Sequence, residues 1–144
     1  MKIARIALVA LALGGTVAHA EGDRTDPDAI ARAKLMATVG MNTKVLGDMA
    51  GGKTTFDAAA AATAKAALSE AAGQIATVFE NQGGEDPADE ARPEIWTNWD
   101  DFIAKAGDLK TAADGVDVAS LDGIKAGMGA VGGTCKACHQ SYRE

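Results

Sequence analysis

The residues with the most specific chemistry form a short motif near the end of the chain, Cys135-Lys136-Ala137-Cys138-His139. A Cys-x-x-Cys-His run is the attachment signature of a c-type haem: two thiols bond to the porphyrin vinyl groups, and the histidine offers its imidazole to the iron. On a helix the three functional residues stand at positions i, i+3 and i+4 and share one face. The motif therefore predicts one covalently bound haem c with His139 as an axial iron ligand.

Two other kinds of site use a Cys-x-x-Cys pair. A thioredoxin-like redox pair is expected at the start of a helix within a βαβ pattern, and a four-ligand zinc site needs further cysteines or histidines. Cys135 and Cys138 are the only cysteines of the chain, and the one other histidine, His19, lies in the leader segment described next. The chain offers neither the βαβ pattern of a redox pair nor the further ligands of a zinc site, so we adopt haem attachment as the interpretation.

Residues 1–20 have the pattern of a secretory signal peptide. Lys2 and Arg5 form a basic start, an apolar run follows over 6–13, and a small-x-small cleavage site ends at Ala20. The apolar run is too short to cross a bilayer. We expect cleavage after Ala20, export to the periplasm, and a single soluble domain over 21–144 with no membrane insertion.

Charge limits the partners that the exported domain can take. Removing the leader takes away two basic residues and no acidic ones, so the formal charge goes from −6 to about −8. An acidic surface disfavours nucleic acid and anionic membranes, and it favours steering towards basic patches on other proteins. We expect redox partner proteins with basic patches. The acidic segment 85–90 is a candidate docking rim, with a merely solvated loop as the other interpretation.

Abundant alanine, few aromatic residues and only three prolines predict an all-α fold. Asp26 is a good N-cap, Pro27 suits the first helical position, and the glycines at 51–52 end the first predicted helix. Short connections between four helices favour an antiparallel up-down-up-down four-helix bundle. The predicted helices cover 27–50, 54–80, 93–115 and 117 onwards, with a polar loop over 81–92.

The last predicted helix has the most regular apolar spacing, and both motif cysteines lie on its apolar seam. The haem is therefore expected inside the bundle, at the end where the start of the first helix, the 81–92 loop and the C-terminus meet. Five glycines in this helix each cost about 1 kcal/mol relative to alanine. Either a neighbouring helix approaches them closely, or the porphyrin needs room beside Gly132. From a cap at Asp117, the seam runs through Val118, Leu121, Ile124, Met128, Val131, Cys135, Cys138 and Tyr142.

The sixth iron position has no second histidine available, so it falls to methionine, to water or a small molecule, or to nothing. Met128 lies on the same helix as His139, about 16 Å along its axis, and cannot reach the opposite haem face. Met49 lies about 20 Å beyond Met36, and Met41 is turned about 140° away from it. Met36, at the haem end of the first helix, is the candidate ligand, with core filler as its other interpretation.

The chain resembles the class II cytochromes c, the family of cytochrome c prime and its low-spin, methionine-ligated relatives. In this family a four-helix bundle carries its haem motif near the C-terminus, and the resemblance covers essentially the whole mature chain. It is carried by Arg-Ala-Lys-Leu-Met at 32–36, Arg-Pro-Glu-Ile-Trp at 92–96, Gly-Thr-Cys-Lys-Ala-Cys-His at 133–139, and Tyr142-Arg143.

The resemblance implies that Cys135 and Cys138 form the thioethers and that His139 is the proximal ligand. Arg143 matches the basic residue that family members place beside the proximal face, although a charge that complements the helix dipole is an equally good interpretation. Arg32 resembles the family arginine near the haem propionates, where a guanidinium pairs with carboxylate. A solvated arginine on the helix face is the alternative.

Position 36 separates the two branches of the family. Cytochromes c prime hold a bulky apolar side chain there, sometimes methionine, which leaves a five-coordinate, high-spin iron able to bind nitric oxide or carbon monoxide. The low-spin branch uses a methionine there as ligand. Residues within 34–47 look more like the low-spin branch, whereas Lys136-Ala137 and the start of the third helix look at least as much like cytochrome c prime. We adopt Met36 as the distal ligand.

Electron transfer is the first functional hypothesis, because two axial ligands leave an iron that changes charge with little change in geometry. Binding of nitric oxide or carbon monoxide is the alternative, with Met36 as a distal residue that does not ligate. No set of paired carboxylates, general base or nucleophile is evident, so we expect no enzyme activity and name no catalytic residue. The alanine-rich surface over 58–67 would permit a homodimer through the first two helices.

Overall fold

The computed structural model describes residues 23–144, which form helices and no β-strand. The predicted cleavage after Ala20 lies outside these residues. Within them, no helix is long and apolar enough to cross a membrane. The helices are α1 (Pro27–Ala50), α2 (Ala58–Val78), α3 (Glu94–Thr97), α4 (Trp99–Asp114) and α5 (Leu121–Tyr142).

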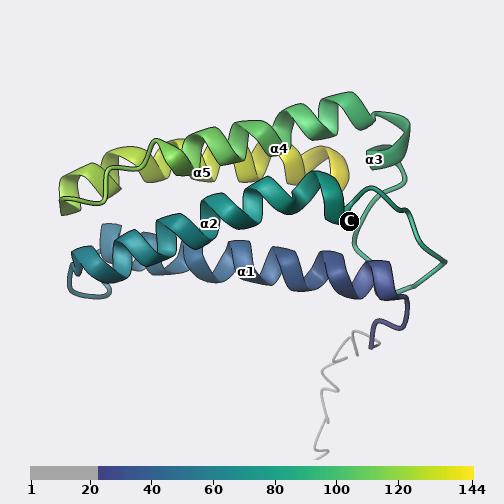
Figure 1. Ribbon diagram of the computed structural model, residues 1–144, viewed down its shortest axis with the longest axis horizontal. Coiled ribbons are helices and arrows are strands. Elements are labelled where there is room, and N and C mark those ends of the chain that lie inside the picture. Colours follow the sequence, from purple (N-terminus) through teal and green to yellow (C-terminus); the bar gives the residue numbers. More distant parts are fainter. Residues whose placement is uncertain (1–22) are drawn as a thin grey trace, which may run out of the picture.

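The four long helices form an antiparallel bundle (Figure 1). α1 packs on α2, α2 on α4, α4 on α5, and α5 returns to α1. Each long helix therefore lies antiparallel to the long helices that precede and follow it in the chain, which confirms the predicted all-α four-helix fold. Four residues, one from each long helix, are fully buried: Leu46, Leu68, Ala113 and Ile124.

Two predicted helix starts differ from the observed ones because nearby side chains supply better caps. α2 begins at Ala58 and not at 54, because Asp57 caps it. The Asp57 carboxylate accepts hydrogen bonds from the backbone N–H groups of Ala59 and Ala60, at 2.9 and 3.0 Å. α5 begins at Leu121, capped by the Ser120 hydroxyl, which accepts from the N–H of Gly123 at 3.0 Å. Asp117, the predicted cap, closes a turn ahead of the helix instead.

The predicted third helix is interrupted at Asn98. This residue has φ −124° and ψ 46°, outside the helical region, so the four-residue α3 and the longer α4 are separate. The carbonyl of Glu94 accepts from both the backbone N–H and the side-chain amide of Asn98, at 2.9 and 3.2 Å. Such side-chain competition for backbone groups is typical of asparagine at helix ends.

The glycines of α5 divide between the two interpretations given above. A Cβ on Gly123 would lie 2.6 Å from the Asp117 carbonyl oxygen, and one on Gly127 would lie 3.1 Å from Val116, so both permit close approach of the α4–α5 connection. A Cβ on Gly132 or Gly133 would meet nothing within 4 Å. Close packing therefore explains Gly123 and Gly127, whereas among the described residues space is open beside Gly129, Gly132 and Gly133.

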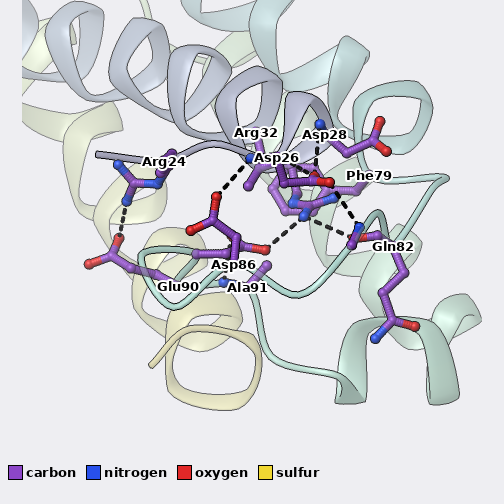
Figure 2. A network of polar contacts seen from close by, with 12 residues as sticks. Arg24, Asp26, Asp28, Arg32, Phe79, Gln82, Asp86, Glu90 and Ala91 are labelled. Carbon is purple, nitrogen blue, oxygen red and sulfur yellow. Dashed lines mark hydrogen bonds and ion pairs between the residues drawn. The ribbon is translucent and has the colours of Figure 1, made fainter. Parts of the chain in front are cut away.

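The loop over 81–92 is fastened to the start of α1 by two aspartates (Figure 2). The Asp86 carboxylate accepts from the backbone N–H groups of Thr25 and Asp26, at 2.7 and 2.9 Å. The Asp26 carboxylate in turn accepts from the N–H of Gly84 at 2.9 Å. Backbone N–H donors are the main reason that the pKa of each carboxyl lies below its usual value: the N–H of Asp26 acts most strongly on Asp86, and that of Ala29, followed by that of Gly84, on Asp26. The loop and the start of α1 thus meet at one end of the bundle, as predicted.

Gly83 is the tightest point of this attachment, which leads to a testable prediction. Its φ is +76°, and a Cβ there would lie 2.5 Å from Asp26 Oδ1. We expect Gly83→Ala to lower the free energy of unfolding by about 1 to 3 kcal/mol in urea denaturation. Gly52→Ala is the matched control, because Gly52 has a similar φ of +71° but nothing within 4 Å. Equal losses in the two variants would contradict the close contact with Asp26.

Candidate haem site

The motif occupies the last two turns of α5. Cys135 and Cys138 are half-buried, pack against the hydrophobic core and are not joined in a disulfide, whereas His139 is exposed. The pKa of both thiols is raised, mainly because the thiols are partly buried. A redox-active pair needs the opposite shift. Within residues 23–144, no group of three or more His, Cys, Asp or Glu side chains could hold a metal ion, which also argues against a zinc site.

The His139 imidazole is in the state that an iron ligand requires. Partial desolvation lowers the pKa of His139, the nearby Arg143 guanidinium lowers it further, and the Glu90 carboxylate opposes both. The neutral imidazole therefore prevails at pH 7, and it is the neutral form that binds metals.

The methionines lie in different environments. Met36 is half-buried on α1 and packs against the core. Met41 is 63% exposed, and Met49 is buried near the opposite end of the helix. The Met128 methyl group lies 4.0 Å from the position of a Cβ on Gly47, so its side chain is directed at the second half of α1. Met36 is therefore the methionine best placed at the end of the bundle where α5 finishes.

Arg32 lies one turn before Met36 and is only 2% exposed, so the alternative of a solvated arginine is wrong. Its two terminal nitrogens donate to the loop: Nη1 to the carbonyl of Asn81 at 2.8 Å, and Nη2 to the carbonyl of Gln82 at 3.0 Å. Nη2 also pairs with the Asp89 carboxylate at 2.7 Å. Its Nε is buried without a hydrogen-bond partner within residues 23–144. Figure 2 shows how the loop wraps around this side chain.

The guanidinium of Arg32 also lies over two aromatic rings. Its central carbon lies 5.9 Å from the ring centroid of Phe79 and 5.2 Å from that of Trp96. Trp96 is held in place because its indole N–H donates to the Phe79 carbonyl at 2.9 Å. Cation–π contacts of this kind strengthen when the cation is desolvated. Arg32 is thus a buried cation that fixes the loop, a role that its helical spacing did not indicate.

Arg143, one turn beyond His139, joins the end of α5 to the loop over 81–92. Its Nε and Nη2 donate to the two carboxylate oxygens of Glu90, at 3.1 and 3.0 Å. Its backbone N–H donates to the carbonyl of His139 at 3.2 Å, and it forms an antiparallel bridge with Ala91. The start of α1, the loop and the end of α5 therefore meet around the motif.

The comparison with known proteins decides the family. The family model described as cytochrome C' matches residues 28–143. The chain belongs to the cytochrome c prime family, the class II cytochromes c.

Two relatives carry different names. Cytochrome c-556 of Agrobacterium tumefaciens (strain apple 185) is 38% identical over 117 residues, which cover 78% of this chain and 91% of the relative. Cytochrome c' of Rhodopseudomonas palustris is 36% identical over 152 residues, covering 99% of this chain and 96% of the relative. Sequence identity thus does not favour one of the two names.

A solved structure agrees with the fold. The nitric oxide complex of a variant of cytochrome c prime from Alcaligenes xylosoxidans matches with a TM-score of 0.70 and 27% identity, over 81% of this chain and 94% of that one. The chain is a monohaem cytochrome, and its cofactor is one covalently bound haem c.

The residues present fit this group. The motif offers two uncommitted thiols and a neutral imidazole, and Met36 offers a thioether. Among the residues that the structure describes, no acceptor pairs with the buried Nε of Arg32, as expected of a site that receives an anionic group such as a propionate. Half-buried apolar side chains pack against the core without being enclosed, namely Val45, Trp96, Trp99, Ile103 and Met128.

Sequence reasoning missed a polar contact behind the motif. The Tyr142 hydroxyl donates to the Asp101 carboxylate at 2.5 Å, and the tyrosine ring packs edge-on against Phe102 at 5.3 Å. Burial, followed by the bond to Asp101, raises the pKa of Tyr142 to about 12. The hydroxyl therefore stays protonated and ties the last turn of α5 to α4. Tyr142 stood on the predicted apolar seam, but nothing in the sequence indicated its partner.

Proposed function

We propose that this cytochrome is a periplasmic electron-transfer protein whose haem iron is ligated by His139 and Met36. The observation that carries the proposal is the half-buried Met36, directed into the core at the end of the bundle where the motif lies. Haem c supplies a one-electron couple when bound, and methionine ligation raises its potential. Cleavage of the leader after Ala20 would release the domain into the periplasm.

The chain itself would keep the two iron ligands in the same positions when the iron changes oxidation state. Cys135 and Cys138 would anchor the group covalently to α5. The Tyr142–Asp101 hydrogen bond fixes the last turn of α5, and Arg32 fixes the loop next to Met36. Ligands on two packed helices change position little, so an electron can be exchanged with little rearrangement.

The acidic groups support electron transfer rather than turnover chemistry. The carboxyls with a lowered pKa, such as Asp48, Asp101 and Asp114, accept hydrogen bonds from neighbouring side chains. A general acid or base would need its pKa moved towards neutrality. We therefore keep the prediction that the protein is not an enzyme.

The partner is proposed to be a protein with a basic patch, docking through a small, weak interface. The segment 85–90 contributes less to such a rim than its composition suggests. Asp86, Asp89 and Glu90 are engaged with the chain itself, and Glu85 is the exposed carboxylate of the segment. A homodimer through α1 and α2 stays a prediction, supported by the exposure of Ile30 (46%) and Met41 (63%) on α1.

Gas binding is the second candidate function. It is supported by the solved structure of the Alcaligenes xylosoxidans relative, which is a nitric oxide complex. In this alternative Met36 packs against the iron without bonding to it, and the apolar surroundings would admit nitric oxide or carbon monoxide rather than anions.

Absorption spectra of the ferric and ferrous protein, with and without carbon monoxide, test the choice. We expect a low-spin ferric spectrum with a weak far-red sulfur-to-iron band and no shift with carbon monoxide. Met36→Ala should lose the band and acquire the shift, whereas Met41→Ala, at an exposed position on the same helix, should change neither. A wild-type high-spin spectrum that shifts with carbon monoxide would replace electron transfer by gas binding.

A further inference from the structure

Two carboxylates fasten the 83–88 segment of the loop to the start of α1. The Asp86 carboxylate accepts from the backbone N–H groups of Thr25 and Asp26, and the Asp26 carboxylate accepts from that of Gly84 (Figure 2). Asp86 also accepts from the N–H of Ala88 at 2.9 Å, and Asp26 also caps α1. Both ends of this contact therefore depend on the same two side chains.

Apolar packing does not hold the 83–88 segment in place. Four of its residues are exposed, and the side chains of Asp86 and Ala88 are only half-buried. The segment also lines a cavity of about 350 Å³, which has the Trp96 side chain on its wall. A segment with few buried apolar contacts opens more easily than the core of a domain. Its closed position therefore rests on the carboxylate hydrogen bonds.

The residues on either side of the segment are attached in another way. Arg32 donates to the carbonyls of Asn81 and Gln82, which precede the segment, and pairs with Asp89, which follows it. A guanidinium keeps its charge at every pH that a protein meets, and a backbone carbonyl does not titrate. An opening that starts at Asp26 and Asp86 is therefore confined to the 83–88 segment.

The two carboxyls make this contact sensitive to acid. Backbone N–H donors lower the pKa of both below the ordinary value of 3.8, with further help from Arg32 at Asp26 and from Arg24 at Asp86, while burial opposes the shift. The closed conformation therefore binds fewer protons than the open one. Its stabilisation by the carboxylates is complete above the ordinary pKa and is lost as the pH falls below it.

The other charged groups at this end of the bundle surround the contact without replacing it. Asp28 lies beside Gly83, Glu85 is exposed on the segment, Arg32 pairs with Asp89, and Arg24 and Arg143 pair with Glu90.

We propose that the 83–88 segment is an acid-operated strap, which closes this end of the bundle at neutral pH and opens, with the bundle still folded, when Asp26 and Asp86 take up protons. Opening uncovers the cavity beside Trp96. Neither electron transfer nor gas binding is needed for this motion, so it goes beyond the proposed function and can fail independently of it.

Hydrogen–deuterium exchange of the haem-bound ferrous protein, followed by NMR at single amides from pH 6 to pH 3, measures the opening. The amides of Thr25, Asp26 and Gly84 report the strap, and the amide of the fully buried Leu68 reports global unfolding. After correction for intrinsic exchange, we expect the opening constant to rise about five- to tenfold for each carboxyl, hence about 25- to 100-fold in total. The three strap amides should lose this protection while Leu68 stays more protected.

Asparagine variants show whether the two carboxyls cause the response. Asp26→Asn and Asp86→Asn keep an acceptor oxygen but cannot titrate, so each should raise the opening constant at pH 6 and leave a rise of only about five- to tenfold at pH 3. The double variant should show no rise. Asp48→Asn is the control, because Asp48 is another α1 carboxyl with a lowered pKa, paired with Lys44 and Lys53. It should leave the response of the strap amides unchanged.

Two results would overturn the strap. One is a rise in the double variant as large as that in the wild type, and the other is equal protection of the strap amides and Leu68 at every pH. If the asparagine variants fail to fold, Gly83→Ala decides, because it crowds Asp26 without removing a titratable group. It should raise the opening constant at pH 6 and keep the full response to acid, and an unchanged opening constant at pH 6 would contradict the strap.

Discussion

Replacing Cys135 and Cys138 together by serine is expected to abolish covalent haem attachment. The two thiols are half-buried on the same face of α5 and engaged in no disulfide, and serine cannot form the thioether. Mass spectrometry of the denatured, exported protein should show the mass of the polypeptide without haem. Each single variant should keep one thioether, seen as a changed pyridine haemochrome spectrum. Lys136→Ala, between the cysteines and exposed, should leave attachment complete.

The double variant should also lose stability, because we expect the haem to cover apolar surface of the bundle. Trp99 and Ile103 on α4 are half-buried side chains that a haem could cover. We expect urea to unfold the double variant at a lower concentration than the wild type. Haem that stays attached through denaturation and acid extraction would contradict the assignment of these thiols.

The chemistry of the motif could be predicted from sequence because it is local. A spacing of three and four residues places Cys135, Cys138 and His139 on one helix face whatever the rest of the chain does. The start of α1 was predictable for the same reason, since Asp26 accepts hydrogen bonds from the N–H groups of Asp28 and Ala29, its near neighbours. Local rules suffice where both partners lie within one turn.

The roles of the other charged residues could not be predicted, because their partners lie far along the chain. Arg32 binds groups 49 to 57 residues away, and Glu90 binds Arg143 across 53 residues. In the sequence, Asp86, Asp89 and Glu90 have the composition of a solvated loop. Only the fold shows that their oxygens accept hydrogen bonds from backbone N–H groups and arginines, which leaves them less free to bind a docking partner.

Removing the buried cation Arg32 is expected to be the most destabilising single change outside the motif. Arg32→Met leaves the carbonyls of Asn81 and Gln82 without donors and Asp89 without its cation. Breaking a buried pair in this way costs about 3 to 5 kcal/mol. Urea denaturation monitored by tryptophan fluorescence measures the loss directly, since Trp96 stacks on the guanidinium. Lys34→Met is the control, an exposed cation on the same helix.

The same substitution separates the two roles that Arg32 can have. If Arg32 mainly anchors the loop, its removal should destabilise the wild type and the haem-free double cysteine variant by similar amounts, and Asp89→Asn should add little once Arg32 is gone. If its unpartnered Nε mainly binds a haem propionate, the loss should occur only in the haem-bound protein. We expect most of the loss in both forms, because both terminal nitrogens already have protein acceptors and both stacking rings belong to the chain. A loss no larger than that in Lys34→Met would show that the buried cation does not stabilise this end of the bundle.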